Sequence, residues 1–157
     1  MVVGDALFRE DETLPYKQAL VDLTEELGIA EKVIFTGFRE DIPEIMSILD
    51  ILVLASWMEP LGMVQLEAMA LEKPIIASNA GGPKEVVVDK QTGILVPPKD
   101  PQALANAVIE LVKNNKLSYM GKTGRQRVER SFSLDSHVQK VERLYEEILS
   151  KKSACSL

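Results

Sequence analysis

The chain has 157 residues, of which 46% are hydrophobic and 27% charged, and its net charge is −6. This length and composition indicate one globular domain with its own core. The negative charge argues against a surface for nucleic acid or anionic lipid, which needs clustered lysine and arginine. The longest apolar run, residues 51–55, is too short for a transmembrane segment, and the first residues do not resemble a signal peptide.

Cysteine and histidine are scarce, which limits the chemistry further. The single cysteine, Cys155, excludes a disulfide within the chain, and we expect a cytoplasmic protein. One cysteine and one histidine cannot form a zinc site, and His137 lies in a helical pattern that favours a plain surface role. We therefore expect no metal.

Short apolar runs typical of strands alternate with helical patterns. In chain order we expect a strand at 2–3, a helix at 13–27, a strand at 33–36, a short helix after Asp41, a strand at 51–55, a helix at 62–71, a strand at 74–78, a short helix at 85–89, a strand at 93–96, and helices at 101–113, 117–130 and 134–150. The start signals are a capping box of Asp41 with Glu44, Asp100 before a proline, and Ser133 before the last helix.

This alternation predicts an α/β fold with a parallel sheet that carries helices on both faces. The continuous apolar run at 51–55 is typical of a strand buried on both faces. Ligands of such sheets bind beyond the carboxyl ends of the strands. The loops at 36–38, 56–62 and 79–83 each follow a strand, so we expect them to line one edge of the sheet.

The helix predicted at 62–71 is apolar nearly all round, and only Gln65 and Glu67 interrupt it. Such a helix is expected to be buried, where an ionised carboxylate is costly unless it is paired or hydrogen-bonded. Glu67 therefore either pairs with a basic side chain or caps a neighbouring loop, or it accepts hydrogen bonds from ligand hydroxyls. A diol suits a carboxylate because two donors meet two acceptor oxygens.

Glu59 lies at the mouth of the loop before this helix, and Pro60 holds its backbone extended. Unpaired amides at Gly62, Met63 and Val64 are expected at the helix start. With the positive end of the helix they could hold a phosphate or sugar oxygen. An ordinary strand-to-helix turn is the alternative interpretation.

The segment from Glu59 to Glu67, followed by Ala-Met-Ala, resembles the E-x7-E signature of the glycosyl transferases group 1 family, which are retaining enzymes of the GT-B fold. Further segments resemble blocks of that family in order and spacing, so the resemblance covers nearly the whole chain. These segments are 33–37, 50–51, 74–78, 81–85, 92–97, 103–105 and 132–133.

The resemblance implies two Rossmann-like domains with an active site between them. Residues 1–150 would form the carboxyl-terminal, donor-binding domain without its first strand, and 151–157 a flexible tail. It would serve a transferase that moves a hexose from a nucleotide diphosphate sugar to an acceptor hydroxyl without a metal. Glu67 would hold the ribose hydroxyls and Glu59, the expected catalytic residue, the donor sugar. The remaining donor contacts would come from Gly62, Met63, Val64, Thr36, Gly37, Phe38, Gly81 and Gly82.

The chain also departs from the family pattern. Basic residues that typically clamp the diphosphate, in a G-R-L and a K-G segment, would precede Met1, and the amino-terminal domain with the acceptor site is not in this sequence. We therefore expect the chain alone to be inactive. A glycosidase remains an alternative because the spatial separation of the two glutamates is not known from sequence.

A non-catalytic fragment or subunit of the same fold, acting in binding, is the other alternative. The last predicted helix has an apolar stripe that must be buried against something, and packing within the chain is the simpler explanation. The stripe comprises Leu134, Val138, Val141, Leu144, Tyr145, Ile148 and Leu149.

Overall fold

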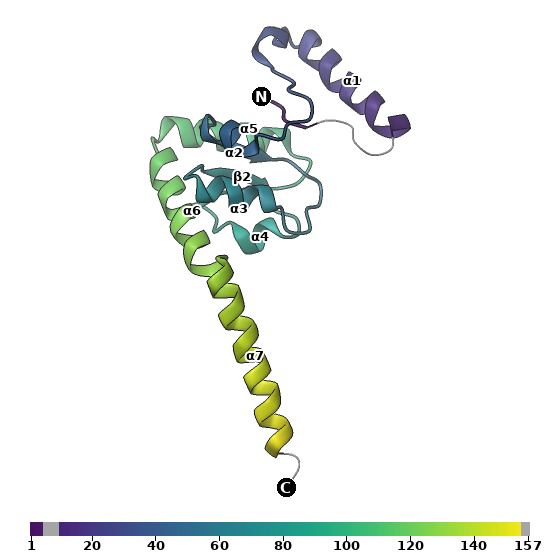
Figure 1. Ribbon diagram of the computed structural model, residues 1–157. Helices are drawn as coiled ribbons and strands as arrows, with labels where there is room; N and C mark the ends of the chain where they lie inside the picture. The colour runs from purple at the N-terminus through teal and green to yellow at the C-terminus, as the bar shows by residue number, and fades with distance from the viewer. Residues whose placement is uncertain (5–9, 155–157) are drawn as a thin grey trace. The chain divides into compact units, whose positions relative to one another are not determined.

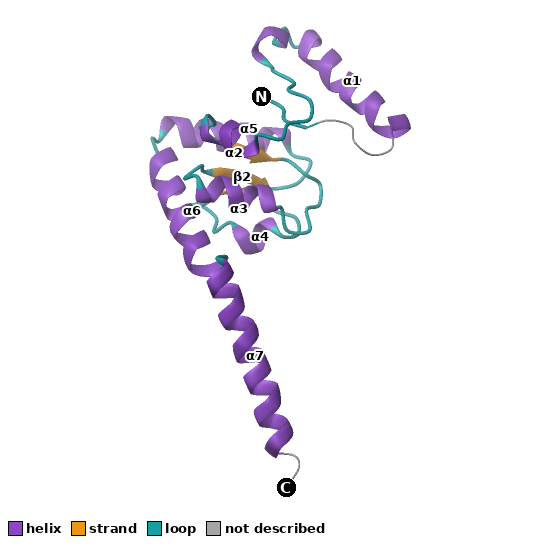
Figure 2. Cartoon of the chain, in the orientation of Figure 1, coloured by secondary structure: helices purple, strands orange, loops and turns teal. Residues whose placement is uncertain are grey.

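The computed structural model describes residues 1–4 and 10–154, which are mostly helical (Figures 1 and 2). They divide into two compact units, Met1–Ile42 and Pro43–Leu157, and each is described by itself below. Cys155 lies outside the described residues. Helix α7 continues to Ala154, into the segment expected to be a tail.

The first unit contains helix α1 (Glu10–Glu26), a 3-10 turn η1 (Ala30–Lys32) and two isolated bridges. The strands predicted at 2–3 and 33–36 are reduced to single bridges of Val2 with Phe35 and Gly4 with Gly37. The backbone nevertheless pairs there, because the amide of Val2 donates to the Ile34 carbonyl oxygen at 2.7 Å. The pairing is thus present but too short to count as strands.

The second unit contains a parallel sheet of three strands, β1 (Leu52–Leu54), β2 (Ile75–Ser78) and β3 (Gly93–Val96), in the order β1-β2-β3. Val53 is paired with Ile76, and Ile76 with Ile94. Because the strands are parallel, their carboxyl ends and the loops that follow them lie at one edge. This confirms the predicted α/β fold with a parallel sheet.

Helices cover both faces of the central strand. Ile76 packs with Ala107 and Leu111 of α5 (Pro101–Lys113) in the main apolar cluster. Its neighbour Ile75 points to the opposite face and is also fully buried. Figure 1 shows α5 and α3 (Met63–Ala70) on opposite sides of β2.

Strand β1 differs from its prediction. The sequence predicted burial on both faces, but Val53 is 42% exposed. The reason is position, since β1 is an edge strand of the sheet while β2 is central. All four residues of β2 are buried, so the predicted pattern of a fully buried strand holds there.

Local signals set the helix starts with different success. Asp100 caps α5 by accepting from the Ala103 amide at 2.8 Å, and Ser133 accepts from the Ser136 amide at the start of α7 (Leu134–Ala154). Helix α4 (Pro83–Val86) begins two residues before the predicted 85–89, because proline suits the first helical turn. The remaining helices are α2 (Ile42–Ser47) and α6 (Leu117–Ser131).

The apolar stripe of α7 is exposed. Packing within the chain was the simpler expectation, and within the described residues it is wrong: Leu134 is 76% exposed and Tyr145 64%. The reason is that α7 contacts α6 near its start and extends beyond the other helices of its unit. Across the described residues, no helix combines the length and apolarity needed to cross a membrane.

Candidate functional site

Two loops meet at the carboxyl edge of the sheet. Residues 55–62 follow β1 and carry Glu59, and residues 79–82 follow β2 and carry Gly81 and Gly82. Glu59 and Gly81 form an isolated parallel bridge. The amide of Gly82 donates to the carbonyl oxygen of Glu59 at 2.8 Å. The structure thus brings together two of the predicted strand-end loops, and the backbone of Glu59 is the point of contact.

Only glycine permits this approach. A Cβ atom on Gly81 would lie 2.3 Å from the carbonyl oxygen of Glu59, and one on Gly82 would lie 2.4 Å from both Leu61 Cα and the Pro60 carbonyl oxygen. These separations are far below ordinary contact, and the clashing atoms are backbone, which cannot rotate away. The two glycines therefore determine how closely the second loop holds the first.

The loop leads into α3 through a left-handed turn. Gly62 has φ +75° and is the N-cap of α3, and no side chain caps this helix end. In the described part of the chain, the amides of Met63 and Val64 have no protein acceptor. Unpaired amides at the positive end of a helix suit an anionic or sugar oxygen. The predicted amide site is thus geometrically open.

The two glutamates that flank this turn have no ion pair or side-chain hydrogen bond among the described residues. Glu59 is half-buried and Glu67 is exposed. The apolar pattern around Glu67 predicted a buried carboxylate, and this is wrong for the chain as described. The reason is that α3 turns Gln65, Ala68 and Met69 towards the interior and leaves Glu67 on its outer side. A salt bridge of Glu67, one of the alternatives, is not found there either.

The buried polar residue of α3 is Gln65, which is 0% exposed. Its Nε2 donates to the Leu61 carbonyl oxygen at 2.9 Å, while its Oε1 has no partner among the described residues. A buried unpaired acceptor costs about 1–3 kcal/mol. In the sequence Gln65 stands out only as an interruption of an apolar helix. That interruption was the signal, since glutamine on the inner face needs hydrogen-bond partners.

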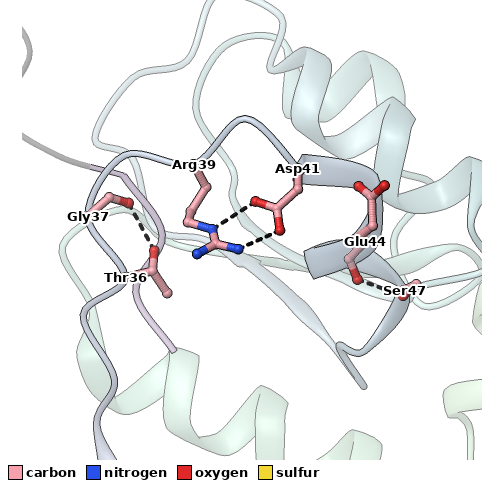
Figure 3. A network of polar contacts seen from close by, with 6 residues as sticks. All are labelled: Thr36, Gly37, Arg39, Asp41, Glu44 and Ser47. Atoms are coloured by element: carbon pink, nitrogen blue, oxygen red, sulfur yellow. Dashed lines mark hydrogen bonds and ion pairs between the residues drawn. The ribbon is translucent and has the colours of Figure 1, made fainter.

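The loop expected near the nucleotide base lies in the first unit (Figure 3). The Thr36 hydroxyl donates to the Gly37 carbonyl oxygen at 2.9 Å, and Phe38 is 56% exposed. Nearby, Arg39 Nε donates to Asp41 at 2.7 Å, and this hydrogen bond lowers the pKa of the Asp41 carboxyl. Asp41, the predicted N-cap of α2, thus directs its carboxylate to Arg39. The expected place of this loop beside the base stays a prediction.

An exposed aromatic contact joins the loops after β1 and β3, and the sequence analysis did not foresee it. The ammonium group of Lys99 lies 4.2 Å from the ring centroid of Trp57. Trp57 is 68% exposed and precedes Glu59 by two positions. A cation over an indole face is a stabilising contact. The contact holds the loop on the amino-terminal side of Glu59, whereas Gly62 lies on its carboxyl-terminal side.

The described residues contain no group of three or more His, Cys, Asp or Glu side chains arranged to hold a metal ion. The two carboxylates can accept hydrogen bonds from hydroxyls. The amides at the uncapped start of α3 can donate hydrogen bonds to phosphate oxygens.

Residues 1–127 match the family model described as glycosyl transferases group 1. The chain belongs to this family. The resemblance identified from the E-x7-E segment is thus confirmed over most of the chain. The matched region of the chain includes both paired loops, α3 and both glutamates.

Relatives within the family act on different compounds. The chain is 32% identical over 131 residues to N-acetyl-alpha-D-glucosaminyl L-malate synthase of Bacillus anthracis, covering 83% of this chain and 34% of that enzyme. It is 33% identical over 136 residues to D-inositol 3-phosphate glycosyltransferase of Salinispora tropica, covering 84% of this chain and 28% of that enzyme. The chain therefore spans about a third of the length of these curated relatives.

Solved structures of the family share the fold. Anabaena Alr3699/HepE in complex with UDP has a TM-score of 0.83 and 31% identity, over 92% of this chain and 40% of that chain. The carboxyl-terminal domain of a glycosyl transferase group 1 family protein (LpcC) from Francisella tularensis has a TM-score of 0.72 and 34% identity, over 77% of this chain and 64% of that chain. The predicted Rossmann-like half of a GT-B fold is thus confirmed.

Proposed function

We propose that the chain is the carboxyl-terminal, donor-binding domain of a retaining glycosyltransferase that uses a nucleoside diphosphate sugar. In this reaction the bond between the anomeric carbon and the diphosphate oxygen breaks, and the diphosphate leaves with the bonding electrons. A bond to the acceptor oxygen forms, the proton of the acceptor hydroxyl passes to the leaving diphosphate, and the anomeric configuration is kept. The sugar transferred is a hexose in this proposal.

The observation that carries the proposal is the pairing of the Glu59 loop with Gly81 and Gly82. It holds a half-buried carboxylate beside the uncapped start of α3, with backbone amides unpaired. This combination offers acceptors for hydroxyls and donors for phosphate oxygens within one turn of chain. The complex of the related Alr3699/HepE with UDP supports a nucleoside diphosphate as the ligand.

Each part of the site receives one role. Glu67, exposed on the outer side of α3, accepts hydrogen bonds from the ribose hydroxyls. Glu59 accepts from donor-sugar hydroxyls and is the catalytic residue. The amides at Met63 and Val64 donate to phosphate oxygens.

Because the chain spans about a third of its curated relatives, we propose that an amino-terminal Rossmann-like domain supplies the acceptor site. Basic residues that stabilise the leaving diphosphate would come from the segment before Met1. No metal takes part in this proposal, since backbone amides and basic side chains supply the donors.

Titration of the chain with UDP, GDP and ADP by NMR tests the proposal. We expect a dissociation constant of about 0.1–1 mM for one of them, because several charge-assisted hydrogen bonds are missing. The amides from Gly62 to Glu67 should shift, equally with and without EDTA. Glu67→Ala should abolish these shifts, and Glu146→Ala, an exposed glutamate of α7, should leave them unchanged. No shift at high millimolar nucleotide would contradict the proposal.

A non-catalytic binding subunit of the same fold is the second candidate. The exposed stripe of α7 favours it, because contiguous apolar surface marks contact sites. Six of its members are 44–76% exposed: Leu134, Val138, Leu144, Tyr145, Ile148 and Leu149. Absence of nucleotide binding together with self-association or capture of an amino-terminal domain would favour this candidate over the first.

A further inference from the structure

Gln65 is a buried amide that is satisfied on one side only. In the part of the chain that the structure describes, its Oε1 is the one buried side-chain oxygen or nitrogen without a hydrogen-bond partner. Its Nε2, by contrast, donates to Leu61 at 2.9 Å, with a longer contact to the Gly62 carbonyl oxygen at 3.4 Å. Among the described residues, the side chain of Gln65 therefore makes hydrogen bonds only to the turn before α3.

The turn it contacts is the one that presents the candidate site. Leu61 and Gly62 connect Glu59 to the first amides of α3. No side chain caps α3 from the outside, so the amide of Gln65 holds the turn from inside the protein. The Gln65 side chain, in the first turn of α3, thus bonds to the carbonyl oxygen of a residue that precedes the helix.

The side chains of Gln65 and Glu59 both lie close to Gly62. The position that a Cβ on Gly62 would take lies 2.3 Å from Gln65 Nε2 and 3.0 Å from Glu59 Cγ. The two side chains thus lie against the same side of Gly62.

The amide of Gln65 has two opposing effects on stability, because its Nε2 bonds to the Leu61 carbonyl oxygen while its Oε1 has no partner among the described residues. Methionine has a similar length and flexibility and fills buried space well, but it would remove the bond to the Leu61 carbonyl oxygen. Glutamine at a fully buried position keeps an orphan oxygen, which burial penalises. A buried group that keeps an unpaired oxygen while it holds a functional turn is typical of a site where stability is exchanged for geometry.

We propose that Gln65 is a positioning residue for donor binding. Its amide fixes the Leu61 carbonyl, and through this turn it holds the Glu59 carboxylate and the amides of Met63 and Val64 in the arrangement that receives the nucleotide sugar. This inference rests on the proposed function, because it assigns Gln65 a role in the same site.

The test separates stability from binding in the 157-residue chain. Gln65→Met removes the amide, and Met69→Leu is the matched control. Met69 is buried on the same helix but faces α6, since its side-chain carbons lie nearest to a Cβ built on Gly124. Thermal unfolding and titration with UDP, GDP and ADP are measured for both variants and for the wild type.

We expect Gln65→Met to unfold close to the wild-type temperature, because the lost bond to Leu61 and the removed unpaired oxygen oppose each other. Its nucleotide affinity should fall roughly tenfold, the effect of about one lost hydrogen bond. Met69→Leu should keep the wild-type affinity. Gly62→Ala should displace the same amide, so adding Gln65→Met to it should weaken binding little further. Such non-additivity is the mark of two residues acting through one contact.

The variant Gln65→Glu gives a further test, because a purely structural role of Gln65 would not make nucleotide affinity depend on pH in this variant. In Gln65→Glu the protonated acid keeps a donor for the Leu61 carbonyl, whereas the ionised acid repels it. The affinity of this variant relative to wild type at the same pH should therefore be highest at low pH and fall as pH rises through the pKa of the introduced acid.

The outcomes are distinct. A wild-type chain that binds nucleotide and a Gln65→Met variant that binds equally well, or fails to fold, would overturn the role of Gln65 and leave the proposed function standing. A wild-type chain that binds none of the three nucleotides would overturn the proposed function and the inference with it.

Discussion

The amide of Gly82 donates to the carbonyl oxygen of Glu59 at 2.8 Å, and this bond joins the loops after β1 and β2. It uses the backbone of Glu59 and leaves its carboxylate without a partner among the described residues. The main chain at Glu59 therefore serves the fold, and the side chain remains available to a ligand.

Gly82→Ala should open this contact. The new Cβ would meet Leu61 Cα and the Pro60 carbonyl oxygen at 2.4 Å, and overpacking of this kind costs about 1–3 kcal/mol. We expect a lower free energy of unfolding and loss of nucleotide binding. Gly28→Ala is the control, because Gly28 has φ +65° but nothing within 4 Å of a Cβ. Gly28→Ala should lower the free energy of unfolding by about 1–2 kcal/mol from backbone strain alone and leave nucleotide binding intact. Nucleotide binding by Gly82→Ala at wild-type strength would contradict the loop contact described above.

Trp57 should report on the site by fluorescence, because it is the only tryptophan. It is 68% exposed with Lys99 over its ring, so its emission should shift little when the chain is unfolded in urea. Lys99→Met should alter the emission of the folded chain, whereas Lys151→Met on α7 should not. A large red shift on unfolding would show that the indole is buried, against the structure.

Two glycines of α6 should respond in opposite ways to the same substitution. A Cβ on Gly121 would lie 1.9 Å from the Glu72 carbonyl oxygen, while one on Gly124 would meet Met69 carbons at 3.4–3.6 Å, an ordinary contact. Gly121→Ala should therefore destabilise the chain by at least about 1–3 kcal/mol. Gly124→Ala should be neutral or stabilise by up to about 1 kcal/mol, because alanine favours helix. Urea unfolding of both variants measures this, and equal effects would contradict the contacts of Gly121 with Glu72 and of Gly124 with Met69.

The chain alone should transfer no sugar at a measurable rate. The leaving diphosphate must be stabilised as charge develops on it, and the acceptor hydroxyl must be held against the anomeric carbon. In our proposal both tasks belong to parts of the protein outside this sequence. Incubation with labelled nucleotide sugars and simple acceptors measures transfer, with Glu59→Ala as the comparison. Turnover by the chain that disappears in this variant would show that one domain suffices.

The local sequence determined much of the helical structure. Asp100 before Pro101 predicted the start of α5, and Ser133 predicted that of α7, because an N-cap acts through bonds to amides two or three residues away. The glutamate spacing likewise identified the family, since a motif is a local pattern. Alternating strands and helices gave the parallel sheet, because parallel strands require crossovers.

Only the tertiary structure decided which side of each element is covered. Val53 is exposed because β1 lies at the sheet edge, and no local pattern distinguishes an edge strand from a central one. Glu67 is exposed and Gln65 buried because the contacts of α3 fix its rotation, whereas a helix that is apolar nearly all round leaves that rotation open. The bond from Gly82 to Glu59 joins residues 23 positions apart, and such pairing depends on how the strands are placed side by side.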